Sequence, residues 1–399
     1  MSKLTVLLGS GFSEGLGLPG TRDFTELVRG PVDESAIALG FRHNVYGSLD
    51  RVSAPQAMWR MASGYYEIVN FENILHLAET IMAYRNIRGW LSAADRAKPA
   101  YGAFMNIMAQ WKEVIDGFSF QMDRFIEDSL NEIARLLIDR ANELSADRRA
   151  KTALLFQRLA RAFKLTIATL NYDDVVERSI DNWNDGFEAV DGMQVFSPLS
   201  LVEESNVPQL LHLHGSVRFY TKQDGAGLSI ARGESTAEAD APQGRRVFFK
   251  DTQAGDPIVL GPMISGLRKS DKVSITPYGY YNWALRDALI RHPKLLVIGY
   301  GGFDSYISDM IQGVYDVHGD NTRAAFVGLR DKTKPITDFG LLLPIYLMGS
   351  RMALSDRRAE LDGLVGLRSW SGNNTCKYFV DGFPLSETEI DEMLVFLQS

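Results

Sequence analysis

Cysteine is almost absent from this sequence, because its 399 residues include only one, Cys376. A single thiol cannot form an intrachain disulfide, and it cannot build the four-cysteine site of a structural zinc ion. Basic residues are outnumbered as well, since 42 Lys and Arg stand against 50 Asp and Glu and give a net charge of −8. A general nucleic-acid binder needs the opposite sign, so we expect no direct binding of nucleic acid by this chain.

Long apolar runs are also missing. The run near the start, within MSKLTVLLGSGFSEGLG, is too short for the apolar core of a secretory signal. The longest later run, residues 339–348, is far below the ~20 residues that span a bilayer. We therefore expect a cytoplasmic protein that does not enter a membrane.

The residues that are present are typical of a globular protein. Hydrophobic residues make up 45% of the chain and aromatic residues 11%, which is enough for a substantial core. At the usual size of ~100–200 residues per domain, the length predicts two or three domains.

The first residues predict a strand, a glycine-rich turn and a helix. Lys3–Leu8 is a β-branched and leucine-rich run, and the turn Gly9-Ser10-Gly11-Phe12-Ser13 follows at once. Thr21 is a good N-cap for a helix over Arg22–Val28. Such a unit brings backbone N–H groups to one point, where they can stabilise an anionic phosphate.

Residues from about 55 to 165 show a different pattern. Apolar side chains recur at spacings of three and four, as in Phe125, Ile126, Leu130, Ile133, Leu136 and Leu137. This spacing predicts helices. We interpret 56–159 as a mostly helical insertion between two parts of one domain, 1–55 and 160–330, with 331–399 as a C-terminal extension that packs on the core.

Short apolar runs return after this region, and polar turns follow three of them. The runs are Leu165–Leu170 before Asn171, Gln209–Leu213 before His214, Lys294–Ile298 before Gly299, and Arg323–Leu329. Buried strands that alternate with helices predict an α/β fold, a Rossmann-like parallel sheet with helices on both faces plus the helical subdomain. Ligands of such sheets bind at the carboxyl ends of the strands, where these turns lie.

Three further segments complete the expected fold. Residues 223–246 are rich in Gly, Ala, Asp and Glu and predict a mobile loop, with a lid as one interpretation. Lys377–Val380 predicts a strand. A helix is expected after Ser386, because Ser386 and Glu389 have the spacing of a capping box.

The glycine turn fits neither of two common phosphate-binding motifs. The fingerprint of dehydrogenases needs a small residue three positions after the second glycine, but Glu14 stands there and Gly15 comes one residue late. No Gly-Lys-Ser/Thr follows either, as a phosphate loop requires. The turn is therefore a nucleotide-phosphate turn of another kind or a plain tight turn.

Asn171 and Asp173 leave two interpretations open. A neutral amide at a strand end can orient a ribose hydroxyl or a water, and the carboxylate can accept a hydrogen bond from a carboxamide such as that of nicotinamide. Alternatively, Asn171 starts a turn and Asp173 caps a following helix.

The histidines raise a third question. His212 and His214 alternate along one strand and face the same side, unless the strand ends between them. The pair suggests a metal, but the sequence indicates no third ligand, and a structural role is the default for either residue. His214 differs because Gly215 and Ser216 follow it and would end the strand, where a neutral imidazole can act as a general base near pH 7.

Taken in order, these segments resemble the sirtuin-like domain, and in particular the bacterial sirtuin-like NAD hydrolases of anti-phage defence, including those encoded beside HerA-type ATPases. The matching segments are Gly9–Ser13 with Gly17-Leu18-Pro19, Thr169–Asp173, Leu213–Ser216 and Val297–Asp304. The resemblance spans roughly residues 3–330 and implies that 1–55 and 160–330 form the NAD-binding catalytic domain.

The resemblance implies a role for each matched residue. Asn171 matches the catalytic asparagine, which orders the ribose hydroxyls or an attacking water. Asp173 matches the acid that holds the nicotinamide carboxamide, and His214 matches the catalytic base. The residues that match positions around the NAD diphosphate are Gly9, Ser10, Gly11, Phe12 and Ser13, and those that match the adenosine side are Gly299, Tyr300, Gly301 and Asp304.

The implied activity is hydrolysis of NAD, as substrate and without a metal, to nicotinamide and ADP-ribose. The resemblance further implies an effector that depletes NAD in abortive infection, a homo-oligomer, and activation by a separately encoded HerA-like ATPase or nucleotide-sensing partner. A zinc-less deacylase or ADP-ribosyltransferase is disfavoured by the missing cysteines, and an oxidoreductase by Glu14. A catalytically silent NAD or ADP-ribose sensor stays open.

Overall fold

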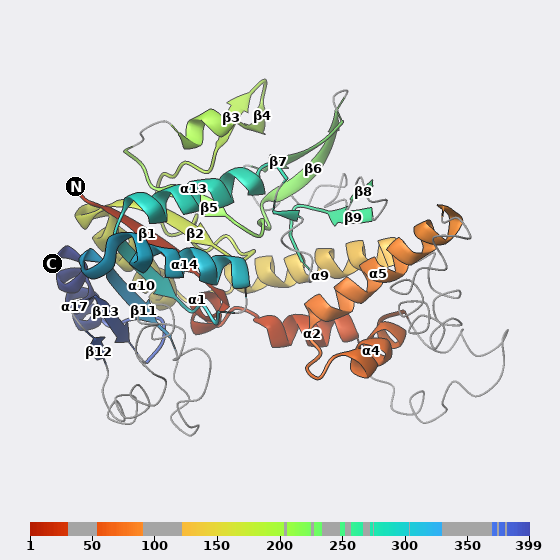
Figure 1. Ribbon diagram of the computed structural model, residues 1–399, viewed down its shortest axis with the longest axis horizontal. Coiled ribbons are helices and arrows are strands. Elements are labelled where there is room, and N and C mark those ends of the chain that lie inside the picture. The colour runs from red at the N-terminus through yellow and green to blue at the C-terminus, as the bar shows by residue number, and fades with distance from the viewer. Residues whose placement is uncertain are drawn as a thin grey trace.

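The computed structural model describes residues 1–30, 54–90, 122–202, 206–224, 227–233, 248–251, 257–265, 272–273, 275–302, 304–328, 369–372, 375–379 and 381–399. Its centre is a seven-stranded sheet in the order β12-β13-β11-β10-β1-β2-β5 (Figure 1). The strands are β1 (Lys3–Leu8), β2 (Lys164–Thr169), β5 (Gln209–His212), β10 (Lys294–Ile298), β11 (Arg323–Val327), β12 (Ser369–Gly372) and β13 (Cys376–Phe379).

Six of these strands are parallel, and only β12 runs antiparallel to its neighbour β13. In chain order the parallel strands lie 6-5-4-1-2-3 across the sheet. This is the order of a doubly wound sheet, in which the winding direction reverses between the first and fourth strands, here β1 and β10. The predicted α/β fold with a Rossmann-like parallel sheet is confirmed.

Helices cover both faces of the sheet because alternate strand residues point to opposite sides. Leu4, Val6 and Leu8 of β1 share a core with α1 (Ser10–Gly15), α10 (Ala146–Ala162) and α17 (Glu387–Gln398). Leu7 belongs instead to the core under α13 (Tyr278–Arg291) and α14 (Ser305–His318). The helix after β1 and the helix after β10 therefore lie on opposite faces, as a switch point requires.

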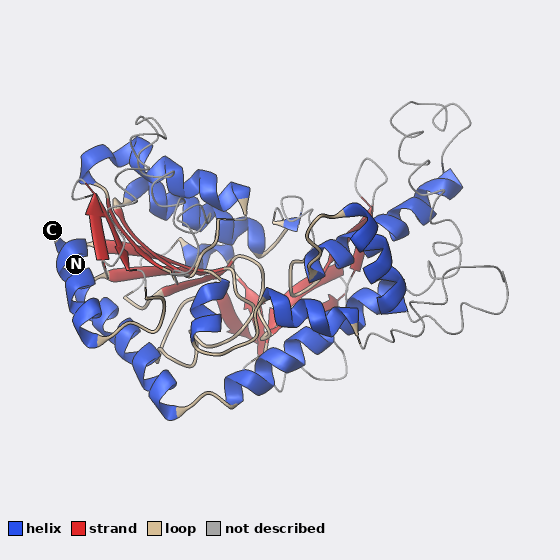
Figure 2. Cartoon of the chain, turned by 90° about the horizontal axis from the view of Figure 1, so that it is seen from below, coloured by secondary structure: helices blue, strands red, loops and turns tan. Residues whose placement is uncertain are grey.

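Four helices pack on one another beside the sheet: α2 (Thr21–Arg29), α4 (Ala54–Tyr65), α5 (Phe71–Trp90) and α9 (Met122–Asn142). They extend from one end of the sheet in both views (Figures 1 and 2). Their buried side chains, such as Met58, Ile74 and Ile126, continue the core that begins at β1. In the described parts of 56–159, the helices expected from the three- and four-residue spacing are present. Residues 91–121 lie outside the described residues, and the proposed domain boundaries stay a prediction.

Two smaller antiparallel sheets were not predicted. One has the order β3-β4-β7-β6, and the other pairs β8 with β9. Their strands are β3 (Phe187–Val190), β4 (Met193–Phe196), β6 (Phe219–Asp224), β7 (Gly227–Arg232), β8 (Phe248–Asp251) and β9 (Pro257–Leu260). The described residues also form two 3-10 turns, η2 (Pro198–Leu201) and η3 (Gly319–Asn321).

The loop expected over 223–246 is wrong at its start, because the chain pairs with itself there. Residues 223–224 end β6, and β7 pairs with β6 along its whole length. The ladder satisfies backbone groups that a loop would leave to water. Residues 225–226 and 234–246 of the expected loop lie outside the described residues, as does the apolar run 339–348.

Several expected boundaries move by a residue or more. Thr21 is the first residue of α2 rather than its N-cap, and the N–H of Gly20 donates to Asp23 Oδ2 at 2.8 Å. The Asp23 carboxylate therefore satisfies the N–H of the N-cap residue Gly20, and no N-cap side chain accepts a hydrogen bond from the first turn, as was expected of Thr21. Among the described helices, none combines the length and apolarity needed to cross a membrane.

Candidate active site

Two glycine turns meet at the switch point. The N–H of Gly9 donates to the Ile298 carbonyl and that of Gly11 to the Gly299 carbonyl, both at 2.9 Å. A Cβ on Gly9 would lie 2.6 Å from the Gly299 oxygen, and one on Gly299, whose φ is +66°, would lie 2.1 Å from the Phe12 nitrogen. Glycine is required here because the turns after β1 and β10 are in backbone contact, at the place where a doubly wound sheet binds its ligand.

The other residues of the first turn have different surroundings. Phe12 is fully buried, with its ring centroid 4.6 Å from that of Phe383 and 6.2 Å from that of Phe156. Its side chain anchors the turn in the core, so a ligand can meet Phe12 only through its backbone. Ser10 is exposed as the first residue of α1, whereas Ser13 is buried.

Ser13, Asn171 and Asp173 form one hydrogen-bonded group across the ends of β1 and β2. Asn171 Nδ2 donates to the Gly9 carbonyl at 2.9 Å and to Ser13 Oγ at 2.8 Å, and Ser13 Oγ donates to Asp173 Oδ2 at 2.6 Å. Because a carbonyl oxygen only accepts, the atom that faces Gly9 must be the amide nitrogen. The oxygen Oδ1 is then the acceptor that Asn171 can offer to a hydroxyl or a water.

Asp173 also forms a hydrogen bond within the turn that follows β2. Its Oδ1 accepts from the Val175 N–H at 3.2 Å, and residues 175–179 form turns rather than the helix that one interpretation expected. Burial raises the pKa of Asp173 to about 6, against the opposing effect of the Ser13 and Val175 hydrogen bonds. A carboxyl with this pKa titrates close to neutral pH.

His214 lies beyond the end of β5 and is only 3% exposed. Its Nε2 is 2.8 Å from the hydroxyl of Tyr306 in α14 and 4.0 Å from Asp304 Oδ1. Burial and the nearby Asp304 raise the pKa of Tyr306, so its phenol stays protonated. The imidazole therefore faces a hydroxyl and a carboxylate at the same edge of the sheet as Asn171.

Backbone contacts hold the Asn171 and His214 turns together. Thr169 and His212 are register partners in β2 and β5, and each of the two site residues comes two positions later. The Val217 N–H donates to the Tyr172 carbonyl at 2.7 Å. Residues 261–265, which we call the strap, join both turns, since the Ile264 N–H donates to the His214 carbonyl at 2.7 Å and Tyr172 Oη donates to the Ile264 carbonyl at 2.6 Å.

The turn after β10 closes on itself. Tyr300 Oη donates to the Asp304 carbonyl at 2.7 Å and lies 3.1 Å from Ser308 Oγ. Burial raises the pKa of Tyr300. Gly301 is half-buried in this turn. The carboxylate of Asp304, expected on the adenosine side, lies beside His214.

Two further residues of this edge escaped the sequence analysis. Tyr306 stands two positions after the last residue of the matched segment, and no pattern marks it. Glu72 comes from α5, and its charge raises the pKa of Tyr172 and Tyr306. No spacing could have indicated Glu72, because about a hundred residues separate it from Asn171.

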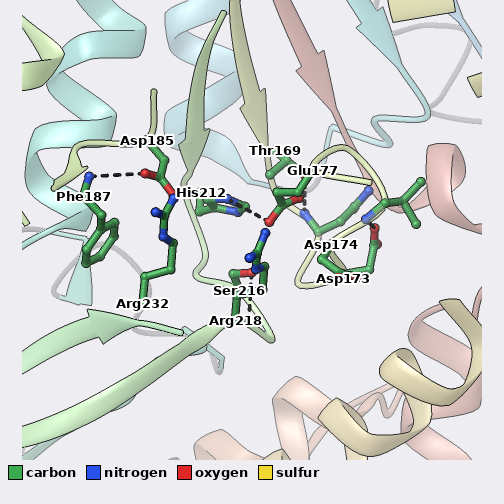
Figure 3. A network of polar contacts seen from close by, with 12 residues as sticks. Thr169, Asp173, Asp174, Glu177, Asp185, Phe187, His212, Ser216, Arg218 and Arg232 are labelled. Carbon is green, nitrogen blue, oxygen red and sulfur yellow. Dashed lines mark hydrogen bonds and ion pairs between the residues drawn. The ribbon is translucent and has the colours of Figure 1, made fainter. Parts of the chain in front are cut away.

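A second polar group, the interior network, lies beside this edge and consists of Glu177, Asp185, His212 and Arg232 (Figure 3). His212 Nε2 is 3.4 Å from Glu177 Oε1, and Arg232 pairs with Asp185 at 2.7 Å. Burial, with the charges of Arg218 and Arg232, lowers the pKa of His212 to about 3, so the imidazole is neutral.

The two histidines therefore do not share a site, because β5 ends at His212. Within the described ranges, no group of three or more His, Cys, Asp and Glu side chains is arranged to hold a metal ion. A cavity of about 530 Å³ lies at the opposite edge of the sheet, where Lys3, Lys164 and Gln209 begin β1, β2 and β5. None of the predicted site residues lines this cavity.

Comparison with known proteins gives one family match. A family model described as a SIR2-like domain matches residues 165–339, which include Asn171, Asp173, His214 and the turn after β10 but not the first glycine turn. A search of the curated proteins finds no match.

One of the solved structures that match this chain has the description "The Structural basis of Sirtuin Substrate Affinity". The two sequences are 12% identical, the match covers 88% of this chain and 95% of the other, and the TM-score is 0.28. A similarity of that size carries no argument about fold or site. The family match stands on its own: residues 165–339 resemble the SIR2-like domain, which is typically a domain of NAD-consuming enzymes.

Proposed function

We propose that this protein is an NAD glycohydrolase, which cleaves the bond between nicotinamide and the ribose C1′. The observation that carries the proposal is the orientation of Asn171. Its amide nitrogen is held by Gly9 and Ser13 at the switch point, and its Oδ1 is left to orient a hydroxyl or a water. The SIR2-like match over residues 165–339 supports NAD as the substrate.

The reaction needs little acid catalysis. The C1′–N bond breaks and its electron pair neutralises the positively charged nicotinamide ring, so the leaving group departs without protonation. The ribose becomes oxocarbenium-like, as in other glycosidic cleavages. A water oxygen then bonds to C1′ and passes its proton to a base.

The residues of the site have the chemistry for these steps. Asn171 orients the ribose or the water, and His214 accepts the proton. Asp173 fixes Ser13 and thereby Asn171, and on the resemblance it also holds the nicotinamide carboxamide. The close packing of Gly9, Gly11 and Gly299 leaves backbone rather than side chains at the switch point, which suits a diphosphate.

The wider role that we propose rests on the resemblance to bacterial defence proteins. The chain acts as a homo-oligomeric effector that depletes NAD in abortive infection when a separately encoded HerA-like ATPase or nucleotide-sensing partner activates it. Nicotinamide release by the full chain, measured with and without the protein encoded next door, tests this role. Equal release in both would contradict control by a partner.

Purified full chain with NAD, analysed for nicotinamide and ADP-ribose by chromatography, tests the activity itself. We expect Asn171→Ala to lower the rate by about 100-fold or more, because misplacement of the reacting groups is that costly. The variant should keep the wild-type circular dichroism spectrum. Undiminished release by Asn171→Ala would refute the assignment, and tight NAD binding without turnover in any condition would support a sensor instead.

A further inference from the structure

The strap is a second link between the Asn171 and His214 turns, in addition to the direct hydrogen bond from the Val217 N–H to the Tyr172 carbonyl. In addition to the bonds to His214 and Tyr172, the Ser216 N–H donates to the Pro262 carbonyl at 3.2 Å. Gly215 and Met263 form an antiparallel bridge, and a Cβ on Gly215 would lie 2.0 Å from the Pro262 oxygen. The strap is thus in direct backbone contact with the turn that carries the base.

A buried ion pair holds the far end of the strap. Lys272 Nζ donates to the Ser265 carbonyl and to Glu79 Oε1, both at 2.6 Å. Lys272 is 2% exposed and Glu79 is 6% exposed. Glu79 belongs to α5, so the pair connects the helical region to the strap.

Stability alone gives a weak reason for such a pair. Replacement of a buried ion pair by apolar residues is often neutral or stabilising, whereas loss of one partner leaves an uncompensated charge. The pair fixes the position of the strap, because Lys272 Nζ can donate to both the Ser265 carbonyl and the Glu79 carboxylate in only one arrangement of the three residues. At the near end, Tyr278 Oη donates to the Gly261 carbonyl at 3.0 Å, so the strap is held at both ends.

We infer that Lys272 and Glu79 are positioning residues for nicotinamide release: they fix the strap, and the strap sets the placement of the His214 backbone relative to Asn171. The inference rests on the proposed function. It also gives the helical region a route to the site, because a displacement of α5 would reach the His214 turn through Glu79, Lys272 and Ser265.

The experiment compares Lys272→Met with Lys151→Met in the full chain. Lys151 pairs with Asp147 at 2.8 Å on the exposed side of α10 and serves as the matched control. We expect Lys272→Met to lower kcat by about 100-fold with KM for NAD within about threefold, as for a group moved by ~1 Å. Lys272→Arg, which keeps the charge and a donor, should recover most of kcat.

Amide hydrogen exchange gives a readout that does not depend on turnover. In Lys272→Met, the amides of Ile264, Ser216 and Val217 should exchange at least about tenfold faster than in the wild type, while Lys151→Met leaves them unchanged. If Lys272→Met fails to fold, Lys272→Met/Glu79→Gln leaves no buried unpaired charge and is measured in its place, with the same expected results.

Three results would overturn the inference: unchanged exchange at these amides in the folded variant, a loss confined to KM, or an equal loss of kcat in Lys151→Met. A wild-type chain that releases no nicotinamide under any condition would instead refute the proposed function. The exchange data would then still decide whether the ion pair holds the strap.

Discussion

His212 and His214 are two residues apart in sequence and have opposite surroundings. His212 is enclosed by the rings of Phe219 and Tyr281 and faces Glu177, in the interior network. His214 lies beyond the end of β5 and faces the hydroxyl of Tyr306 and the carboxylate of Asp304. The difference arises from the end of β5, which falls at His212.

The comparison shows that the position relative to the strand end decides what a buried histidine can do here. Both imidazoles are almost inaccessible, at 1% and 3% exposure, so burial does not separate them. His212 contacts Glu177 and two aromatic rings, none of which is a predicted site residue. His214 lies with Asn171 at the carboxyl edge of the sheet, where ligands of doubly wound folds bind.

Alanine at the two positions should give the largest contrast. We expect His214→Ala to lower nicotinamide release by about 10²- to 10⁴-fold, the usual worth of a general base. His212→Ala should leave kcat per folded molecule within about threefold and lower the free energy of unfolding by ~3 kcal/mol, because it opens a cavity and removes the partner of Glu177. Kinetics and urea titrations of both variants check this. Equal losses of activity would show that the strand end does not separate the histidines.

The buried ion pair between Arg232 and Asp185 in the interior network should be more sensitive to the loss of its positive charge than an exposed ion pair. Arg232→Met leaves Asp185, which is 2% exposed, without its ion-pair partner. We expect the free energy of unfolding to fall by about 3–5 kcal/mol.

Arg291→Met is the matched control, because Arg291 and Asp287 are also 2.7 Å apart but are 67% and 35% exposed. Its loss should stay below about 1 kcal/mol. Urea titrations of both variants make the measurement, and a second substitution, Asp185→Asn in the Arg232→Met background, should restore part of the stability. Similar losses in the two arginine variants would contradict the role of burial.

Much of the parallel sheet can be predicted from the sequence, and the reason is visible in the same region. β1 and β10 begin and end where their apolar runs do, because both are buried on both faces. β3 shows why other elements could not be predicted: its residues after Phe187 are exposed, so neither alternation nor a continuous run marks it. Its pairing with β4 comes from backbone hydrogen bonds, which every residue type except proline can donate.

The candidate site also contains some residues that the sequence predicts and others that it does not. Asn171, Asp173 and His214 could be singled out because each follows a recognisable strand. The contact of Asn171 with Ser13 and the roles of Tyr306 and Lys272 could not, because tertiary packing brings these residues together across gaps of tens to more than a hundred positions. The functional roles of all these residues stay predictions.

Asp173 of the candidate site and His212 of the interior network should change the free energy of unfolding with pH in opposite directions. Burial raises the pKa of Asp173 from 3.8 to about 6, so its contribution to stability is present at low pH and is lost as the pH rises through 6. Burial lowers the pKa of His212 from 6.5 to about 3, so its contribution is present above 6.5 and is lost as the pH falls. Between about pH 4 and pH 6 each amounts to about 2–3 kcal/mol, at ~1.4 kcal/mol per pH unit.

Unfolding free energies of Asp173→Asn and His212→Asn, measured from pH 4 to pH 7 against the wild type, check this. Relative to the wild type, Asp173→Asn should become more stable as the pH rises, and His212→Asn should become more stable as the pH falls. Parallel pH profiles for the two variants would mean that the two groups do not differ in their charge states.

The smallest expected effect is the loss of kcat on removal of the hydrogen bond between His214 and Tyr306. Tyr306→Phe removes the hydroxyl that lies 2.8 Å from Nε2 and keeps the ring. We expect kcat to fall by about tenfold, or ~1.4 kcal/mol, the size of one hydrogen bond to the reacting group. Tyr315→Phe, on the same helix, is the control and should leave kcat unchanged.

A double-mutant cycle decides whether the phenol acts through the imidazole. If Tyr306 works only by holding Nε2, Tyr306→Phe should cause no further loss in the His214→Ala background, because the partner is already gone. A full tenfold loss in that background would mean that the phenol meets the substrate directly. The contrast between the two histidines would then depend on the tyrosine in α14 as much as on the end of β5.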